Sequence, residues 1–419
     1  MKLRLKYSKI IDNKFKYVWP ILVLGAISAY VGVYIFFARP RGFKGDFYAA
    51  MYDPNWWDGE GLFYGPLFVF ERWIVNSFPK IATVNFFAFQ VLLTLTVSLL
   101  IILRVVHADR VFSLFGLIVW IGNSYFYYSF SVAANPEILE LLFLVLMWWA
   151  LSRRYIKTAY AFFSLAVITK IVPIIFSPVL LFVFNPQAFL IALLVIFLSI
   201  FVVAFGQHQG VISIFKDLIP VSIVDPQPNS EQYLGLSSAL SRVFGVSPAG
   251  DFKNVTNLAI GITIILFLFI SYVALAIFRN ASFSSYESSI AYIFSAFLSL
   301  MPLMHFTNTH RHTFLFLGPI WIALRYVYIN DINRRRSRIF SMIFTGFFFI
   351  YTALPIYFLD IYPVSKFSGI HLGETYNSFI MLSEPIWTNL AIIVAIIIYG
   401  FSMVRTSKIK KVSSLPSIA

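Results

Sequence analysis

Asp46 lies shortly beyond the first apolar segment of this 419-residue chain, in the run Gly45-Asp46-Phe47-Tyr48. Two further acids, Asp58 and Glu60, and the run Tyr64-Gly65-Pro66 follow in the same stretch. A carboxylate placed just outside a membrane helix and followed by aromatic residues suits a general base that acts on a lipid-linked substrate. We therefore expect this stretch to carry reactive residues.

Lys170 is a cation inside an otherwise apolar stretch, between Val167 and Pro173. A lysine buried in a membrane is energetically costly and usually has a functional role. Pro173 and Pro178 interrupt the stretch, so we predict two short segments that meet near Lys170, with irregular backbone tolerated only against protein or a water-filled cavity. The alternative is a lysine whose stem reaches along the apolar surface to the outer head groups.

Two further polar clusters contain cations. The run 229–242 includes Gln232 and Arg242, and this arginine either pairs with an outer-leaflet phosphate or binds a substrate phosphate through two hydrogen bonds. The run 305–312 carries His305, then His310-Arg311-His312. No nearby carboxylate completes a metal-ligand set there, so we predict a patch for an anionic group. A plain polar turn between helices is the alternative.

Glu137 and Glu140 follow Pro136 at the start of an apolar segment. Proline in the first turn of a helix, followed by acids, matches ordinary N-terminal capping chemistry. We interpret this pair as structural.

The elements that must position these residues are membrane helices. Hydrophobic residues make up 59% of the chain and charged residues 12%, where a soluble protein averages about 25% charged. Apolar runs long enough to cross a bilayer recur throughout. The candidate spans are 17–37, 84–103, 111–130, 136–152, 187–206, 257–278, 286–304, 313–329, 338–358 and 388–404, with a broken or re-entrant pair at 158–184. This pattern predicts one all-α polytopic membrane domain over 1–419, with about 10–12 transmembrane segments.

The charge pattern gives the predicted orientation. Most of the 32 Lys and Arg fall on one side when the spans are threaded, which places both termini in the cytoplasm and most of the acids outside or within the membrane. The net charge of +14 is therefore a topology signal and does not indicate nucleic-acid binding. Three long outward segments result, 38–83, 207–256 and 359–387, and the aromatic residues of the first favour helices lying along the membrane interface. The absence of cysteine excludes disulfides, zinc–thiolate sites and iron–sulfur clusters.

Taken in order, four of these segments resemble the GT-C superfamily of membrane glycosyltransferases, and within it the polyprenyl-phosphate-mannose-dependent mannosyltransferases that build phosphatidylinositol mannosides. Asp46-Phe47-Tyr48 with Tyr64-Gly65-Pro66 resembles the acid-plus-Tyr-Pro-Pro loop of that family, and the segment 170–178 resembles its Lys-x-x-Pro segment. The segments 229–242 and 302–319 resemble its Asn-Gln-Ser-Leu-x-Gly stretch and its His-rich motif. Gly65 stands in place of one proline, Glu231-Gln232-Tyr233 replaces Asn-Gln-Ser, and the histidines are spaced differently.

The resemblance implies an inverting transfer, on the extracytoplasmic face of the cell membrane, of a sugar carried on polyprenyl phosphate. Mannose is favoured by resemblance alone, and the acceptor would be a glycolipid or cell-envelope glycan. Asp46 would be the general base, with Asp58 and Glu60 as alternatives. Lys170, Arg242 and Arg311 would bind the donor phosphate, while His310 or His312 would add a cation or tune the carboxylate. Tyr48, Asp58, Glu60, Tyr64, Gln232 and His305 are the expected substrate contacts. We expect no obligatory metal or other cofactor, and the remaining partners are membrane lipids.

Other functions fit parts of the same pattern. A transporter or lipid flippase would carry similar broken segments in two repeats, and the sequence shows one such pair, near Lys170. A non-catalytic scaffold subunit would retain its function after Asp46→Ala. A ligase or polymerase of the same architecture, or an arabinosyltransferase, would use the same lipid-phosphate chemistry on a different glycan.

Overall fold

A computed structural model describes residues 65–75, 77, 80–106, 110–121, 137–206, 210–212, 236, 240, 244, 252–279, 285–304, 309–330, 339, 342–346, 348 and 385–413. The predicted span 17–37 lies outside these residues, as do most of the predicted span 338–358 and most of the predicted outward segments 207–256 and 359–387. The described part of the chain is helical, and no strand occurs within it.

The described elements follow the predicted spans closely. They are α3 (Gly65–Val75), α4 (Lys80–Val105), α5 (Arg110–Ile121), α7 (Glu137–Ser152), α8 (Ile156–Thr169), η5 (Val172–Phe176), α9 (Ser177–Val179), η6 (Leu180–Phe184), α10 (Pro186–Gly206), α14 (Phe252–Arg279), α15 (Tyr286–Met304), α16 (Thr309–Asn330) and α21 (Pro385–Ser413). The bounds of α15 coincide with those predicted. Helix α5 covers the first part of the predicted span 111–130, whose remainder lies outside the described residues, and α14 begins several residues before its predicted start.

Two of these helices, Pro186–Gly206 and the part Asn254–Arg279 of α14, are long and apolar enough to cross a membrane. Large apolar side chains on both are exposed on the surface of the protein, as a lipid-facing helix requires, including Leu194 and Phe201 on α10 and Leu268 on α14. The number of membrane crossings and the orientation of the chain stay predictions.

Local sequence explains where the helices begin. Asn185 precedes Pro186, and its Oδ1 accepts a hydrogen bond from the amide of Ala188 at 3.1 Å, which is a standard N-cap ahead of a proline in the first turn. Ser285 caps α15 in the same way, because its Oγ accepts the amide of Ser288 at 3.1 Å. Both caps satisfy amides that have no partner inside the helix.

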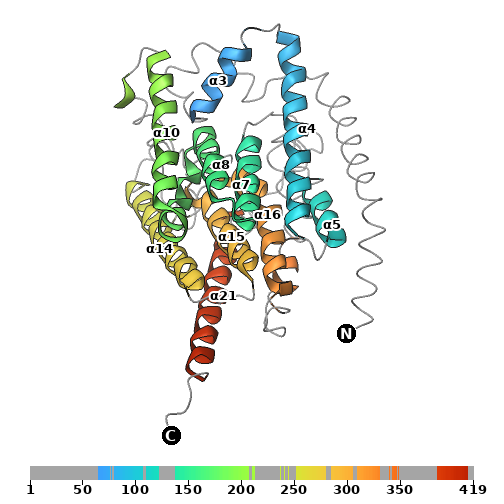
Figure 1. Cartoon of the computed structure of the whole chain (residues 1–419), viewed down its shortest axis with the longest axis vertical. Coiled ribbons are helices and arrows are strands. Elements are labelled where there is room, and N and C mark those ends of the chain that lie inside the picture. Colours follow the sequence, from blue (N-terminus) through green and yellow to red (C-terminus); the bar gives the residue numbers. More distant parts are fainter. Residues whose placement is uncertain are drawn as a thin grey trace.

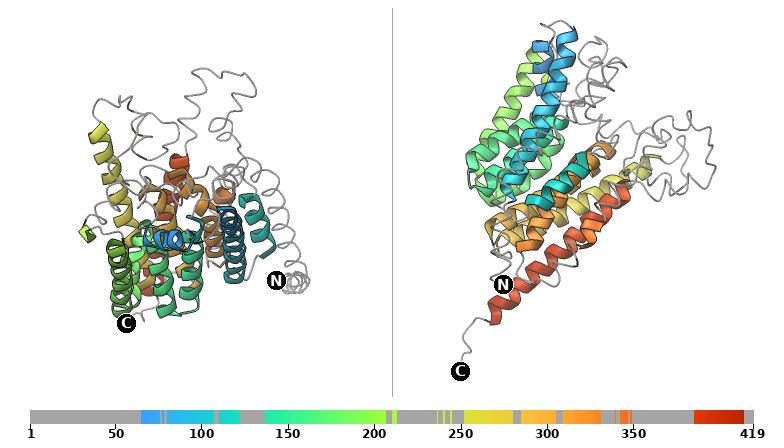
Figure 2. Two further views of the ribbon diagram at one scale, coloured as in Figure 1. Left: turned by 90° about the horizontal axis from the view of Figure 1, so that it is seen from above. Right: turned by 90° about the vertical axis from the view of Figure 1, so that its right-hand side faces the viewer.

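The helices pack in two groups that meet at α7 (Figures 1 and 2). Helix α7 contacts α8 and α4 on one side and α15 and α16 on the other, while α10 packs on α8. Helices α14, α15, α16 and α21 pack against one another in the second group. Helix α3 crosses one end of the bundle, between α10 and α4 (Figure 1).

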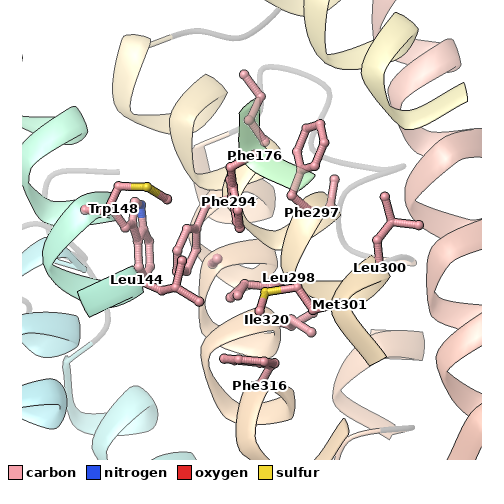
Figure 3. Packing of buried hydrophobic residues seen from close by; sticks show 14 of the residues in the cluster. Leu144, Trp148, Phe176, Phe294, Phe297, Leu298, Leu300, Met301, Phe316 and Ile320 are labelled. Carbon is pink, nitrogen blue, oxygen red and sulfur yellow. The ribbon is translucent and has the colours of Figure 1, made fainter. Parts of the chain in front are cut away.

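Aromatic side chains fill the junction between the two groups. Trp148 of α7 stacks on Phe294 of α15, with ring centroids 4.7 Å apart. Phe176 of η5 lies against both Phe294 and Phe297, at 6.1 and 5.3 Å (Figure 3). Such tightly packed ring pairs fix the orientation of the elements that carry them. The irregular segment that follows Lys170 is therefore anchored in the core of the protein.

Candidate functional site

Lys170 lies at a break between helices, as predicted from the prolines. Helix α8 ends at Thr169, and Lys170 takes an extended backbone conformation with φ −154° and ψ 140°. Helix α8 does not continue through Pro173, which lacks the amide hydrogen that would pair with the Thr169 carbonyl oxygen, and the chain resumes as the 3-10 helix η5. The prediction of two short segments that meet near Lys170 is confirmed for the backbone.

The far end of the broken segment is tied back to α8. The hydroxyl of Tyr160 donates a hydrogen bond to the carbonyl oxygen of Leu180 at 2.6 Å and accepts one from the amide of Asn185 at 3.1 Å. These bonds pair backbone groups at the two ends of the π-helical stretch η6, whose backbone hydrogen bonding differs from that of an α-helix. Together with Phe176 in the core, they hold the segment after Lys170 in one conformation.

The side chain of Lys170 is buried and forms an ion pair with Glu137. Its exposed fraction is 4%, that of Glu137 is 2%, and the Lys170 ammonium donates a hydrogen bond to Glu137 Oε1. An unpaired ion in such surroundings would cost several kcal/mol, so a buried lysine needs a nearby counter-charge. Glu137 provides that counter-charge from the first turn of α7.

Glu140 is the third member of this cluster. It lies one turn further along α7, is fully buried, and is attracted electrostatically by the Lys170 ammonium while Glu137 repels it. The positive end of the α7 dipole favours both acids at this position. The cluster therefore combines one cation and two carboxyl groups beneath the surface, which is an arrangement suited to exchanging a counter-ion or a proton.

Gly65 brings the start of α3 against the backbone that leads into Lys170. Its φ is +62°, and a Cβ added there would lie 2.5 Å from the carbonyl oxygen of Ile168 and 3.0 Å from that of Thr169. Only glycine takes this conformation without strain and lets two backbones approach so closely. Proline cannot take it, because its ring fixes φ near −65°. The geometry thus gives a physical reason for glycine at position 65.

Two further contacts hold α3 across the end of the bundle. Gln90 of α4 donates a hydrogen bond to Glu71 Oε1 at 2.7 Å. At the other end of α3, the Trp73 ring covers Gly206, where an added Cβ would lie 2.8 Å from the ring. Helix α3 therefore contacts α8, α4 and α10, and the helix that we expected along the membrane interface is attached to the bundle at three points.

Most of the other predicted site residues lie outside what the structure describes. These are Asp46, Tyr48, Asp58, Glu60, Tyr64, Gln232, Arg242 and His305. The backbone of His310, Arg311 and His312 belongs to the first turn of α16, and their side chains are outside the described part. The roles assigned to these residues stay predictions. Among the described residues, no group of three or more His, Asp or Glu is arranged to hold a metal ion.

Sequence reasoning missed the pairing of Glu137 with Lys170. The two residues lie the same number of residues from the Arg153–Arg154 turn that joins α7 to α8. An antiparallel helical hairpin brings such positions together, and a lysine in an apolar stretch calls for a counter-charge. Those two signals together would have found the pair. The capping interpretation of the acids is compatible with the pairing, since they do begin α7.

Comparison with known proteins gives no further constraint on the site. No protein-family model matches this chain, and no match was found among curated proteins or among solved structures.

Proposed function

We propose that this chain is a membrane glycosyltransferase of the GT-C type, which moves a sugar from polyprenyl phosphate to a glycolipid or cell-envelope glycan. The observation that supports the proposal is the contact of Gly65 with Ile168 and Thr169. Two motifs on which the resemblance depends, Tyr64-Gly65-Pro66 and the segment that begins at Lys170, are distant in sequence and adjacent in space. Such convergence of separate motifs is what a shared substrate site requires.

The chemistry assigned to each group follows from the resemblance. Asp46 removes the proton from the acceptor hydroxyl as the hydroxyl oxygen bonds to the anomeric carbon. The bond from that carbon to the phosphate oxygen breaks, and the leaving lipid phosphate takes the electron pair. A cation is needed for that developing charge, and we assign this role to Lys170, which directly follows the Thr169 carbonyl group that lies against Gly65. To bind phosphate, Lys170 exchanges its hydrogen bond with Glu137 for one with a phosphate oxygen.

The test is a transfer assay with purified full-length protein, radiolabelled polyprenyl-phosphate mannose and a lipid extract as acceptor source. Asp46→Asn is expected to lower turnover by about 10²–10⁴-fold, as loss of a general base does. Asp53→Asn is the matched control, since Asp53 is an acid of the same segment with no assigned role. Undiminished turnover in Asp46→Asn, with loss in Asp58→Asn or Glu60→Gln, would move the base to that residue. No transfer from several polyprenyl-phosphate sugars would refute the donor class.

A transporter for a lipid-linked glycan is the second candidate, and the buried cluster of Lys170, Glu137 and Glu140 favours it. Ionisable residues beside a broken helix are typical of substrate and ion pathways. The two candidates separate in proteoliposomes that contain a fluorescent polyprenyl-phosphate sugar. Protein-dependent movement of the label between leaflets, without any change in the covalent structure of the lipid, would establish transport. Formation of a new glycoside would establish transfer.

A further inference from the structure

The contact between Glu71 of α3 and Gln90 of α4 has an unusual shortage of hydrogen-bond donors. The Gln90 amide nitrogen donates to Glu71 Oε1 at 2.7 Å. The other oxygen of each group, Glu71 Oε2 and Gln90 Oε1, is buried and has no hydrogen-bond partner among the described residues. Buried polar atoms are nearly always paired, so two unpaired oxygens in one contact need an explanation.

A single proton removes both deficits. An ionised carboxylate only accepts hydrogen bonds, whereas a protonated carboxyl group also donates one. With a proton on Oε2, Glu71 has a donor to offer the acceptor oxygen of Gln90, while Gln90 continues to donate to Oε1. Carboxylic acid and amide then satisfy each other in both directions. The pair as it stands is one hydrogen short of this arrangement.

Within the described part of the chain, no charged group offsets the cost of burying a carboxylate at Glu71. Helix α10 carries no charged residue. On α4, Lys80 and Arg104 lie about 15 and 21 Å from Gln90 along the helix axis, and on α8 Lys157 lies about 18 Å from Thr169. Beyond α8, Lys170 faces Glu137. The Tyr160 hydroxyl of α8 donates its hydrogen bond to the Leu180 carbonyl oxygen. Arg72 directly follows Glu71 on α3, a spacing at which side chains on a helix do not face each other. Burial therefore dominates and raises the pKa of Glu71 to about 7, against a smaller lowering by the Gln90 hydrogen bond.

We propose that Glu71 and Gln90 form a proton-binding site. Protonation of Glu71 holds α3 against α4, and loss of the proton weakens the contact between the two helices. Deprotonation releases one proton to solvent and leaves a buried carboxylate with a single hydrogen bond from Gln90. Because α3 also carries Gly65 against the cluster at Lys170, the proton affects the geometry of the candidate site from a distance. The inference does not depend on the proposed glycosyl transfer.

The absence of cysteine makes a direct test possible. Ile74 is exposed on α3, so Ile74→Cys accepts a single spin label on the full-length protein in lipid nanodiscs. We expect the mobility of the label to rise with pH, with a midpoint near pH 7. Glu71→Gln is the matched control, because two amides pair in both directions without titrating. Its label should show low mobility at every pH.

Infrared difference spectra test the proton itself. We expect a protonated carboxyl band about one pH unit below the midpoint that is lost above it and is absent from Glu71→Gln. Gln90→Leu should keep the band and raise the label mobility at all pH values. A wild-type spectrum identical to that of Glu71→Gln at low pH would overturn the proposal. A mobility transition that persists in Glu71→Gln would overturn it as well.

Discussion

Lys170 and Glu137 join the two helices of one hairpin through a buried ion pair at the end away from their turn. Lys170 follows the last residue of α8, and Glu137 is the first residue of α7. The pair therefore fixes the register of α8 against α7 at the place where the helix breaks. Glu137 therefore orients the Lys170 side chain at the candidate site. The sequence alone indicates only that Glu137 caps the start of α7.

Removing the cation should destabilise the protein strongly. Lys170→Met leaves Glu137 and Glu140 buried without their positive charge, and breaking a buried pair in this way costs about 3–5 kcal/mol. The double variant Lys170→Met with Glu137→Met should recover much of the loss, since no uncompensated ion remains at that position. Denaturant unfolding of the detergent-solubilised protein measures both. Equal stability of the single and double variants would show that the pair is not coupled.

Gly65→Ala should release α3 from α8. Alanine in the left-handed region costs about 1–2 kcal/mol, and its methyl group would also clash with the Ile168 carbonyl oxygen. We expect faster amide hydrogen exchange over α3 and in the last turn of α8, read by mass spectrometry. Gly261→Ala is the control, because nothing lies within 4 Å of a Cβ at that position. In the interior of α14 this control should leave exchange unchanged or slow it.

Gly206→Ala should displace the Trp73 ring. The added methyl group would lie 2.8 Å from the ring, which can swing away at a modest cost of about 1 kcal/mol. The expected result is faster exchange confined to the C-terminal turn of α3, with the Gly65 end unaffected. Gly210→Ala, in open space a few residues later, should have no effect. Exchange that rises equally along the whole of α3 would contradict independent attachment points.

Stability should fall as pH rises through the pKa of Glu71. Because burial raises that pKa from 4.5 to about 7, the folded chain holds a proton there that the unfolded chain has already lost. The stabilisation is complete below pH 4.5 and is lost by the time the pH exceeds about 7. Glu71→Gln should therefore match wild type at low pH and exceed it by roughly 2 kcal/mol at high pH, with the partial exposure of Glu71 taken into account.

The measurement for this last prediction is the melting temperature of wild type and variant across the pH range. Glu287→Gln serves as the control, because Glu287 is an exposed acid in the first turn of α15. Its pH profile should follow that of wild type. A constant difference between Glu71→Gln and wild type at all pH values would exclude titration of Glu71 as the cause.

Much of the helical framework was predictable from sequence, because long apolar runs and prolines report directly on helix extent. The ends of α15 and the break at Lys170 are examples. The contacts of the candidate site were less predictable. Apolar runs show that Lys170 is surrounded by protein or lipid but not that Glu137 faces it. Likewise, the sequence shows Gly65 only as a glycine where the resembling family has proline. The need for glycine at this position follows from the close approach of its backbone to Ile168, which only the structure shows. The reactive roles of Asp46 and the His310–His312 segment stay predictions.

The three attachments of α3 impose an order on biosynthesis. Its partners on α4, α8 and α10 are all translated after it, and the last of them, Gly206, follows Val75 by about 130 residues, or on the order of ten seconds of synthesis. Until then α3 has only part of its final protein surroundings. The earliest helix of the described chain is thus not fully attached until α10 has been made, so the candidate site cannot be completed while the chain is still short of α10.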